Sequence, residues 1–275
     1  MAAPDESGRL DHIAWESRGS GGGLPLLALH GVTDAGGCWW PALADVARSR
    51  RVVTVDARGH GGSALTDEPF TIAALAADAA RVLREVVGGP AVVLGHSMGG
   101  LAAEELALTA PELVAALVLE DPAWLASDDA RNDRGAPIWL PDVIASIAGR
   151  SHAEIVAAGR TENPGWPDDE LDAWATARLQ LDPHLADGEH RWADRDWVEA
   201  MAGVRAPVTL VTGDVARGAL VDAAQVARAA ELLGDRLTVV AVPGAGHSIR
   251  REARQRFREA LGTALAAADA AAQVR

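Results

Sequence analysis

Two patterns of hydrophobic and polar residues alternate along this chain. Short, continuous apolar runs are typical of strands buried on both faces of a parallel sheet. Such runs, with one weaker alternating stretch at the start, occupy residues 10–16, 24–29, 51–56, 91–94, 114–119, 207–212 and 237–242. Longer segments with the spacing of amphipathic helices occupy residues 39–47, 71–87, 101–108, 222–233 and the C-terminal tail. Strands that alternate with helices predict a mostly parallel α/β sheet with helices on both faces.

The alternation is interrupted between residues 122 and 206. This region holds six of the nine tryptophans and 16 acidic residues against eight arginines, with proline breaks and no strand pattern. We interpret it as a helical cap inserted over the carboxyl ends of the strands, where such sheets bind ligands. The predicted organisation is a core of residues 1–121 and 207–275 with a cap of residues 122–206. The cap tryptophans could equally contact an apolar substrate or form the core of the cap.

Charge narrows the classes of partner. The formal charge is −14, all 25 basic residues are arginine, and neither lysine nor tyrosine occurs. An acidic surface repels phosphate backbones and anionic lipids, so nucleic acid and membrane surfaces are disfavoured as partners. The absence of lysine excludes Schiff-base chemistry and P-loop phosphate binding. We expect a small-molecule substrate as the partner and leave a homodimer open.

The chain has one cysteine, Cys38, which we expect to be a small buried or pocket-side residue. One thiol cannot form an internal disulfide, as a secreted scaffold would. No segment has the apolar length of a signal peptide or a membrane span. These features predict a cytoplasmic protein.

The segment Gly95-His96-Ser97-Met98-Gly99 carries the most specific chemical signal. It follows an apolar strand and opens a helix, which is the setting of a nucleophile elbow. A sharp strand-to-helix turn lifts the serine hydroxyl clear of the sheet, and glycines are needed where a Cβ would collide with the neighbouring backbone. We therefore predict Ser97 as a nucleophile, with the adjacent His96 turned away into the helix-sheet packing.

A serine nucleophile needs a base, which a third group orients. His247 lies in a glycine-rich loop after the last strand, as the chain order Ser, acid, His requires, and we predict it as the base. For the acid we favour Asp121, at the end of the strand after the nucleophile helix. Asp214, just past the strand after the cap, is the main alternative, and Glu120 is a further one.

Acyl transfer also needs donors aimed at the developing oxyanion. Elbow geometry predicts the backbone N–H of Met98 as one donor and that of Val32, in the loop after the apolar run 24–29, as the other. Candidate substrate-binding residues are Gly31, Asp34, Trp40 and Trp124. His30 and His60 lie in loops at strand ends, where they either line the pocket or satisfy backbone groups.

These residues resemble the α/β-hydrolase superfamily over essentially the whole chain. The matching marks are His30-Gly31, the segment 56–63, the Gly95–Gly99 elbow, the Asp121 strand end and Gly244-Ala245-Gly246-His247. The resemblance implies an eight-stranded, mostly parallel sheet, a Ser-His-acid triad, a helical cap and neither cofactor nor metal. An acid on the earlier strand is similar to the subset that includes ring-cleavage amide hydrolases of vitamin B6 breakdown and some lactone hydrolases.

We therefore expect a serine hydrolase that cleaves an ester, lactone or amide bond of a small, largely apolar molecule through an acyl-enzyme. Thioesterase and carbon–carbon bond hydrolase activities, and a cofactor-free perhydrolase using peroxide, stay open within the enzyme class. A ligand-binding receptor with a slow triad is the alternative from another class.

Overall fold

The computed structural model describes residues 4–125, 132–192 and 195–273. An eight-stranded sheet lies at its centre, with the strand order β1-β2-β4-β3-β6-β7-β9-β10. β1 pairs antiparallel with β2 and β2 with β4, and every other neighbour in this sheet is parallel. Its strands are β1 (Glu6–Leu10), β2 (Ile13–Gly22), β3 (Leu26–Leu29), β4 (Arg50–Val55), β6 (Ala91–His96), β7 (Val114–Glu120), β9 (Val208–Thr212) and β10 (Leu237–Ala241). This architecture confirms the predicted fold.

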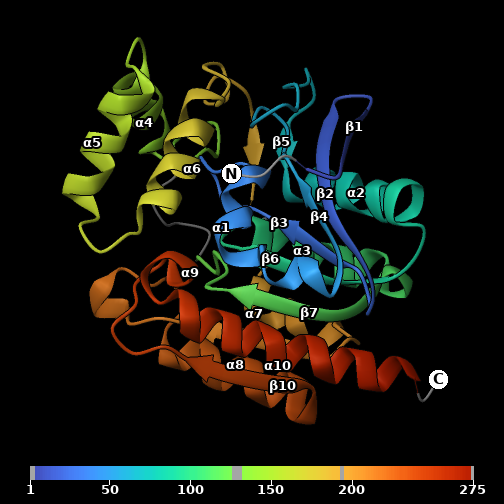
Figure 1. Ribbon diagram of the computed structural model, residues 1–275. Helices are drawn as coiled ribbons and strands as arrows, with labels where there is room; N and C mark the ends of the chain where they lie inside the picture. Colours follow the sequence, from blue (N-terminus) through green and yellow to red (C-terminus); the bar gives the residue numbers. More distant parts are fainter. Residues whose placement is uncertain (1–3, 126–131, 193–194, 274–275) are drawn as a thin grey trace.

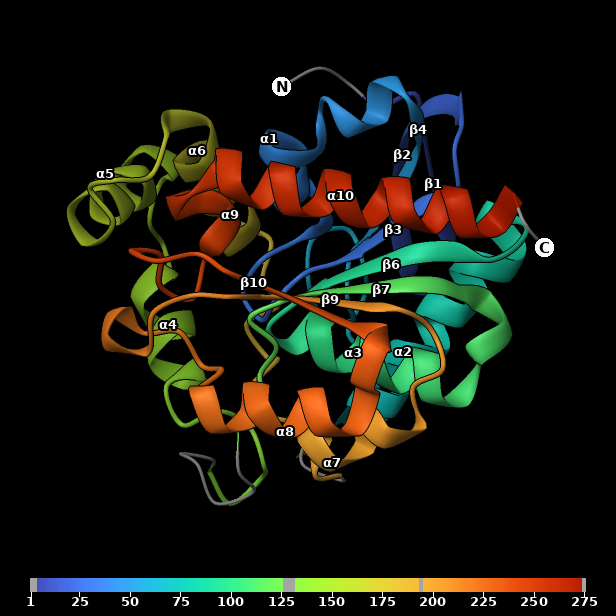
Figure 2. The same cartoon turned by 90° about the horizontal axis from the view of Figure 1, so that it is seen from below.

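Helices cover both faces of the sheet (Figure 2). One face carries α1 (Trp40–Leu43) and α10 (Arg254–Gln273); the other carries α2 (Ile72–Val82), α3 (Met98–Thr109) and α8 (Ala223–Leu233). The central strands are mostly apolar, as expected for strands that pack against helices on both faces. All four residues of β3 are buried, and so are all six of β6.

Residues 121–207 connect β7 to β9 through a helical segment. It contains α4 (Leu140–Ile147), α5 (His152–Glu162), α6 (Asp168–Leu179), the short strand β8 (His190–Arg191) and α7 (Trp197–Ala200). α4, α5 and α6 gather beyond one end of the sheet (Figure 1). Residues 126–131 and 193–194 of the predicted cap lie outside the described residues.

Two predicted elements differ from the observed ones, and a third, the helix capped by Thr71, is confirmed with a different end. The opening strand is a hairpin of β1 and β2, which turns at Asp11 with a φ of 52°. The helix predicted over 39–47 is instead a 3₁₀ turn (Gly36–Trp39), α1 and a second 3₁₀ turn (Val46–Arg48). The helix predicted over 71–87 is α2, capped by the Thr71 side chain, followed by a π-helical end over Leu83–Val87. Contacts with the rest of the fold outweigh helical spacing in such short segments.

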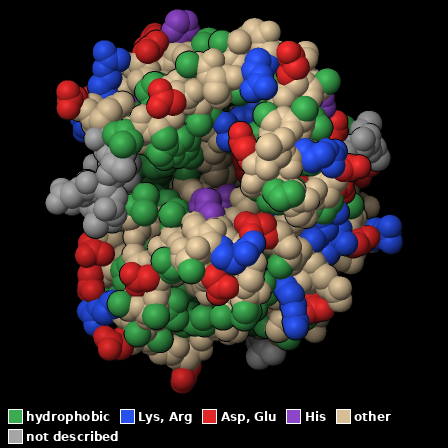
Figure 3. All heavy atoms as spheres, turned by 90° about the vertical axis from the view of Figure 1, so that its left-hand side faces the viewer, with side chains coloured by type: hydrophobic (Ala, Val, Ile, Leu, Met, Phe, Trp, Pro, Cys, Tyr) green, Lys and Arg blue, Asp and Glu red, His purple; other side chains and the backbone are tan. Residues whose placement is uncertain are grey.

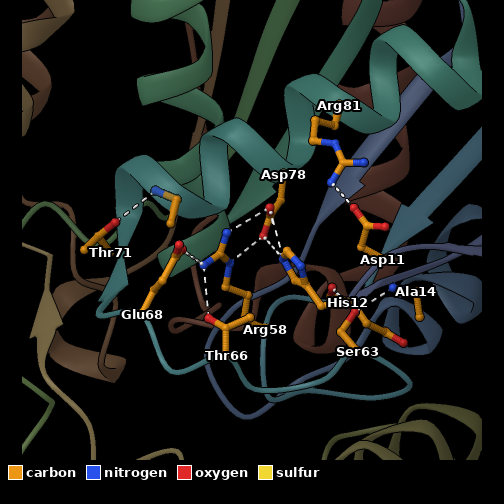
Figure 4. Close-up of polar contacts among 12 residues, drawn as sticks. Asp11, His12, Ala14, Arg58, Ser63, Thr66, Glu68, Thr71, Asp78 and Arg81 are labelled. Atoms are coloured by element: carbon orange, nitrogen blue, oxygen red, sulfur yellow. Dashed lines mark hydrogen bonds and ion pairs between the residues drawn. The ribbon is translucent and has the colours of Figure 1, made fainter.

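The glycine-rich bend after β4 is held by a cluster of polar side chains (Figure 4). Arg58 donates to both carboxylate oxygens of Asp78 on α2, at 2.7 and 3.1 Å, and His12 contacts the same carboxylate at 3.1 Å. The Ser63 hydroxyl accepts from the Ala14 N–H at 2.7 Å. These contacts tie the bend to β2 and α2, so the loop beside the site is anchored to the core.

Within the described residues, no helix is long and apolar enough to cross a membrane.

Candidate active site

Ser97 lies at the turn between β6 and α3, in a backbone conformation that side chains rarely adopt. Its φ and ψ are 53° and −118°. A Cβ on Gly95 would lie 2.2 Å from the Gly99 carbonyl oxygen, and one on Gly99 would lie 2.2 Å from the carbonyl oxygen of Leu29. Both positions therefore require glycine, and the strained turn projects Ser97 from the end of the strand.

His247 and Asp121 come together across the carboxyl ends of two strands. Nδ1 of His247 lies 2.6 Å from Oδ2 of Asp121, which is fully buried. The same carboxylate accepts from the backbone N–H groups of Leu220 at 2.8 Å and Val221 at 3.1 Å. A carboxylate held by two backbone donors is fixed in position, and it directs the Nδ1 proton of His247 toward itself.

Ser97 and His247 both line one cavity, whose volume is about 450 Å³. Among the described residues, Ser97 Oγ makes no hydrogen bond to His247; such bonds are often long until substrate binds. Both residues line the same cavity. Because Nδ1 of His247 contacts Asp121, Nε2 is the ring nitrogen that is available to Ser97.

His96 occupies a different position from the one predicted. It lines the cavity instead of the helix-sheet packing, with its ring centroid 4.6 Å from that of His247. Its Nε2 donates to the His247 carbonyl oxygen at 3.0 Å. Burial lowers the pKa of His96, and the nearby Arg250 lowers it further. A neutral His96 therefore supports the loop that carries His247. The prediction was wrong because the strained turn changes the direction of neighbouring side chains.

The loop after β3 faces the elbow and is positioned by two neutral histidines. The N–H of Ala57 donates to Nε2 of His30 at 2.9 Å, so Nδ1 carries the proton that reaches the Gly31 carbonyl oxygen at 2.8 Å. His60 Nδ1 contacts the Arg58 carbonyl oxygen at 2.8 Å. Burial lowers the pKa of both rings, that of His60 to about 3. Both histidines satisfy backbone groups here.

The two predicted oxyanion donors come from different segments, the start of α3 and the loop after β3. Met98 is the first residue of α3, where an N–H has no acceptor within the helix. Val32 and Gly31 line the cavity, and a Cβ on Gly31 would lie 2.8 Å from Nδ1 of His96. Glycine at 31 therefore permits the close approach of this loop to the elbow.

The cavity opens as a hollow with hydrophobic walls and a histidine at its base (Figure 3). One wall comes from the sheet loops and the other from the helical segment. The helical segment contributes an apolar set together with one arginine, namely Pro137, Trp139, Val143, Trp166, Trp174, Arg178 and Trp192. This composition suits an organic molecule with an apolar body.

A buried ion-pair network lies beneath the cavity. Asp34 lines the cavity, but its two oxygens accept from Arg250 at 2.6 Å and from Arg251 at 2.8 Å. Burial opposes ionisation of Asp34, yet the two guanidiniums outweigh it and hold the pKa of Asp34 far below its usual range. Glu120 is fully buried and accepts from the Arg250 backbone at 2.6 Å and from its guanidinium at 3.1 Å. Asp34 and Glu120 are therefore already partnered.

Three other candidates lie apart from the pocket. Asp214, the main alternative acid, accepts from the Gly244 N–H at 2.6 Å and so supports the turn before His247. Trp40 is 2% exposed, and its indole N–H donates to Glu16 at 2.8 Å, on the far side of the loop after β3. Trp124 is 3% exposed and donates to Glu104 on α3 at 2.9 Å. We correct the expectation that these two tryptophans contact substrate, because each is buried in the core and its indole N–H donates to a glutamate there.

Sequence reasoning did not single out the cavity residues Arg178 and Arg251, and it left open which of the cap tryptophans line the cavity. The clustering of tryptophans in 122–206 was the one available signal, and it did not separate cavity tryptophans from core ones. Within the described residues, no group of three or more His, Cys, Asp and Glu side chains is arranged to hold a metal ion.

The chain is similar to known proteins over most of its length. The model of the α/β hydrolase family matches residues 26–260. The chain is 29% identical over 255 residues to the 2-(acetamidomethylene)succinate hydrolase of Mesorhizobium japonicum, with 87% of each chain covered. It is 35% identical over 176 residues to the lipase LipV of Mycobacterium tuberculosis, with 63% of each covered, so it matches less than two thirds of that lipase's length.

Solved structures show the same fold. The crystal structure of E-2-(acetamidomethylene)succinate hydrolase superposes with a TM-score of 0.70 and 24% identity, covering 95% of this chain and 99% of that one. An esterase from Rhodococcus superposes with a TM-score of 0.74 and 24% identity, covering 96% and 99%. The chain belongs to the α/β hydrolase family. The relatives named here are hydrolases, and they support hydrolase activity for this chain.

Proposed function

We propose that the protein is a serine hydrolase that cleaves an ester, lactone or amide bond through a Ser97-His247-Asp121 triad. The observation that carries the proposal is the 2.6 Å contact between Nδ1 of His247 and the buried carboxylate of Asp121. His247 lines the same cavity as Ser97. Asp214 accepts a hydrogen bond from the Gly244 backbone, and Glu120 accepts one from Arg250. These partners favour Asp121 over both alternatives as the acid of the triad.

In the proposed mechanism, Ser97 Oγ attacks the substrate carbonyl while Nε2 of His247 accepts the hydroxyl proton. Asp121 stabilises the imidazolium that forms, and the N–H groups of Met98 and Val32 donate to the oxyanion. His247 then protonates the leaving group, which departs and leaves an acyl-enzyme. Water then attacks the acyl carbonyl while Nε2 of His247 accepts its proton, and His247 returns that proton to Ser97 Oγ as the acid product leaves.

The cavity supports a small substrate with an apolar body. Its volume of about 450 Å³ and its tryptophan walls suit a molecule of modest size. We further propose that the helical segment acts as a cap, because it supplies one whole wall of this cavity. Cleavage of a thioester or a carbon–carbon bond would use the same catalytic groups, so substrates of both kinds are assayed beside the esters.

The test is hydrolysis of p-nitrophenyl esters with acyl chains of two to about eight carbons, by wild type and Ser97→Ala. We expect turnover by wild type and background rates for Ser97→Ala. Mass spectrometry after treatment with a p-nitrophenyl alkylphosphonate should show one adduct on wild type and none on Ser97→Ala. An adduct that persists in Ser97→Ala, or undiminished turnover by that variant, would refute the role of Ser97. Phosphonate labelling without turnover of any ester, amide or thioester would instead favour the receptor.

A further inference from the structure

Arg178 on α6 lines the cavity without a carboxylate partner. Among the described residues its side chain forms no ion pair within 4.0 Å and no hydrogen bond, and its Nε is buried without an acceptor. A guanidinium carries five N–H donors, and leaving a buried one without an acceptor, as at Nε of Arg178, is costly. An unpartnered arginine in the wall of a substrate cavity is therefore a candidate ligand site.

The other cationic side chain of the cavity is in a different state. Arg251 donates to Asp34 at 2.8 Å and lies 3.5 Å from Glu170. Asp34 also accepts from Arg250, so both of its oxygens are occupied. Asp34 attracts Arg178 only from a distance, without a hydrogen bond. Asp34 is thus fully paired without Arg178.

The contact that Arg178 does make leaves its donors available. Its guanidinium carbon lies 4.7 Å from the centroid of the Trp174 ring. Such a cation–π contact uses the face of the guanidinium, whereas the N–H groups point outward in its plane. Trp174 in turn packs edge-to-face on Trp166, with ring centroids 6.1 Å apart. Stacking on this rigid aromatic pair orients the guanidinium.

Electrostatics point the same way. Burial lowers the pKa of Arg178, and this effect exceeds the attraction of Asp34 and of Glu162 on α5. The charged guanidinium is therefore under-compensated in the protein alone. A ligand anion in the cavity would supply the missing charge and the missing acceptors.

We propose that Arg178 binds a carboxylate on the substrate, so that the enzyme acts on esters, lactones or amides that carry a free carboxylate on an apolar body. The planar fork of a guanidinium matches a carboxylate, with two parallel N–H···O bonds. A single unpaired cation balances one negative charge, and a phosphate dianion would bring a second charge close to Asp34. This inference rests on the proposed hydrolase function and narrows its substrate class from largely apolar to amphipathic.

The catalytic test compares 4-acetoxybenzoate with 4-acetoxybenzamide, two acetate esters of nearly the same shape that differ in charge. We expect wild type to prefer the carboxylate in kcat/KM, mainly through KM. Arg178→Gln should reduce this preference about 10- to 100-fold, the range expected for a charged hydrogen bond, and Arg178→Lys should retain part of it. Arg160→Gln is the matched control, because Arg160 is exposed on α5 and pairs with Asp168 at 2.8 Å. Its preference should equal that of wild type.

A binding test does not depend on turnover. Calorimetry on Ser97→Ala should show binding of 4-phenylbutyrate, weaker binding of 4-phenylbutyramide, and loss of the difference when Arg178→Gln is added. Hydrolysis of both acetate esters without a preference, or a preference that survives Arg178→Gln, overturns the carboxylate site and leaves the hydrolase intact. Arg178-dependent binding without hydrolysis of either ester overturns the hydrolase and supports the site. Equal binding of acid and amide overturns the site.

Discussion

Replacing Asp121 by asparagine tests the identity of the acid most directly. The Asp121 carboxylate accepts three hydrogen bonds, from His247 and from the backbone of Leu220 and Val221. An asparagine has one carbonyl oxygen and one NH₂ group, so it cannot accept all three. If its oxygen takes the place of Oδ1, it accepts from the Val221 N–H alone, and the NH₂ in the place of Oδ2 faces the Leu220 N–H and donates to Nδ1 of His247. The ring proton then moves to Nε2, where it prevents His247 from accepting the proton of Ser97.

Two losses contribute to the expected effect. The wrong tautomer removes the base, and the imidazolium loses the carboxylate that stabilises it. For a serine hydrolase, we expect kcat/KM for p-nitrophenyl butyrate to fall about 10,000-fold, or about 5.5 kcal/mol of transition-state stabilisation. Stability should fall by about 1–3 kcal/mol, since one buried backbone donor or the histidine loses its acceptor.

The matched control is Asp214→Asn. Asp214 accepts from the Gly244 N–H at 2.6 Å and supports the loop without contacting His247. We expect this variant to keep kcat/KM within about 10-fold of wild type, since one backbone hydrogen bond is worth about 1 kcal/mol. Initial rates give kcat/KM of both variants, and urea unfolding gives their stability. A collapse of Asp214→Asn while Asp121→Asn stays active would refute the reasoning and move the acid to the strand after the helical segment.

Three further predictions concern stability and reactivity. Burial lowers the pKa of His60 from 6.5 to about 3, so between these pH values the unfolded chain binds a proton that the folded chain does not. His60 therefore contributes stability that is lost as the pH falls below about 6.5, by about 1.4 kcal/mol per pH unit. In urea unfolding from pH 7.5 to 5.0, the free energy of unfolding should fall less steeply with pH for His60→Gln than for wild type, and equal slopes would contradict this. Gly99→Ala should lower the free energy of unfolding by at least about 3 kcal/mol, because its Cβ would lie 2.2 Å from the Leu29 carbonyl oxygen. In the control Gly262→Ala on α10, the added Cβ meets nothing within 4 Å, and this variant should have a higher Tm than wild type. Burial raises the pKa of Cys38 to about 12, so iodoacetamide at pH 8 should label this thiol only after unfolding, and labelling of the native protein would count against its burial.

Much of the fold could be predicted because its signals are local. An apolar run such as that of β6 indicates a buried strand wherever it occurs, and the glycines around Ser97 indicate a tight turn from steric necessity alone. The predictions that failed lie where local signals are weak. The segment around Trp39 has helical spacing, but its short turns follow the loops against which they pack. The direction of His96 depends on a backbone strain that the neighbouring residues impose.

The sequence by itself determined the α/β architecture, the position of the elbow and the order of the candidate triad residues along the chain. Only the tertiary structure decided which carboxylate meets His247, because Asp121, Asp214 and Glu120 all satisfy the chain order and differ only in their partners. It also decided that Trp40 and Trp124 belong to the core and that Arg178 faces the cavity unpaired. Partners and burial arise from residues far apart in the chain, and no local pattern records them.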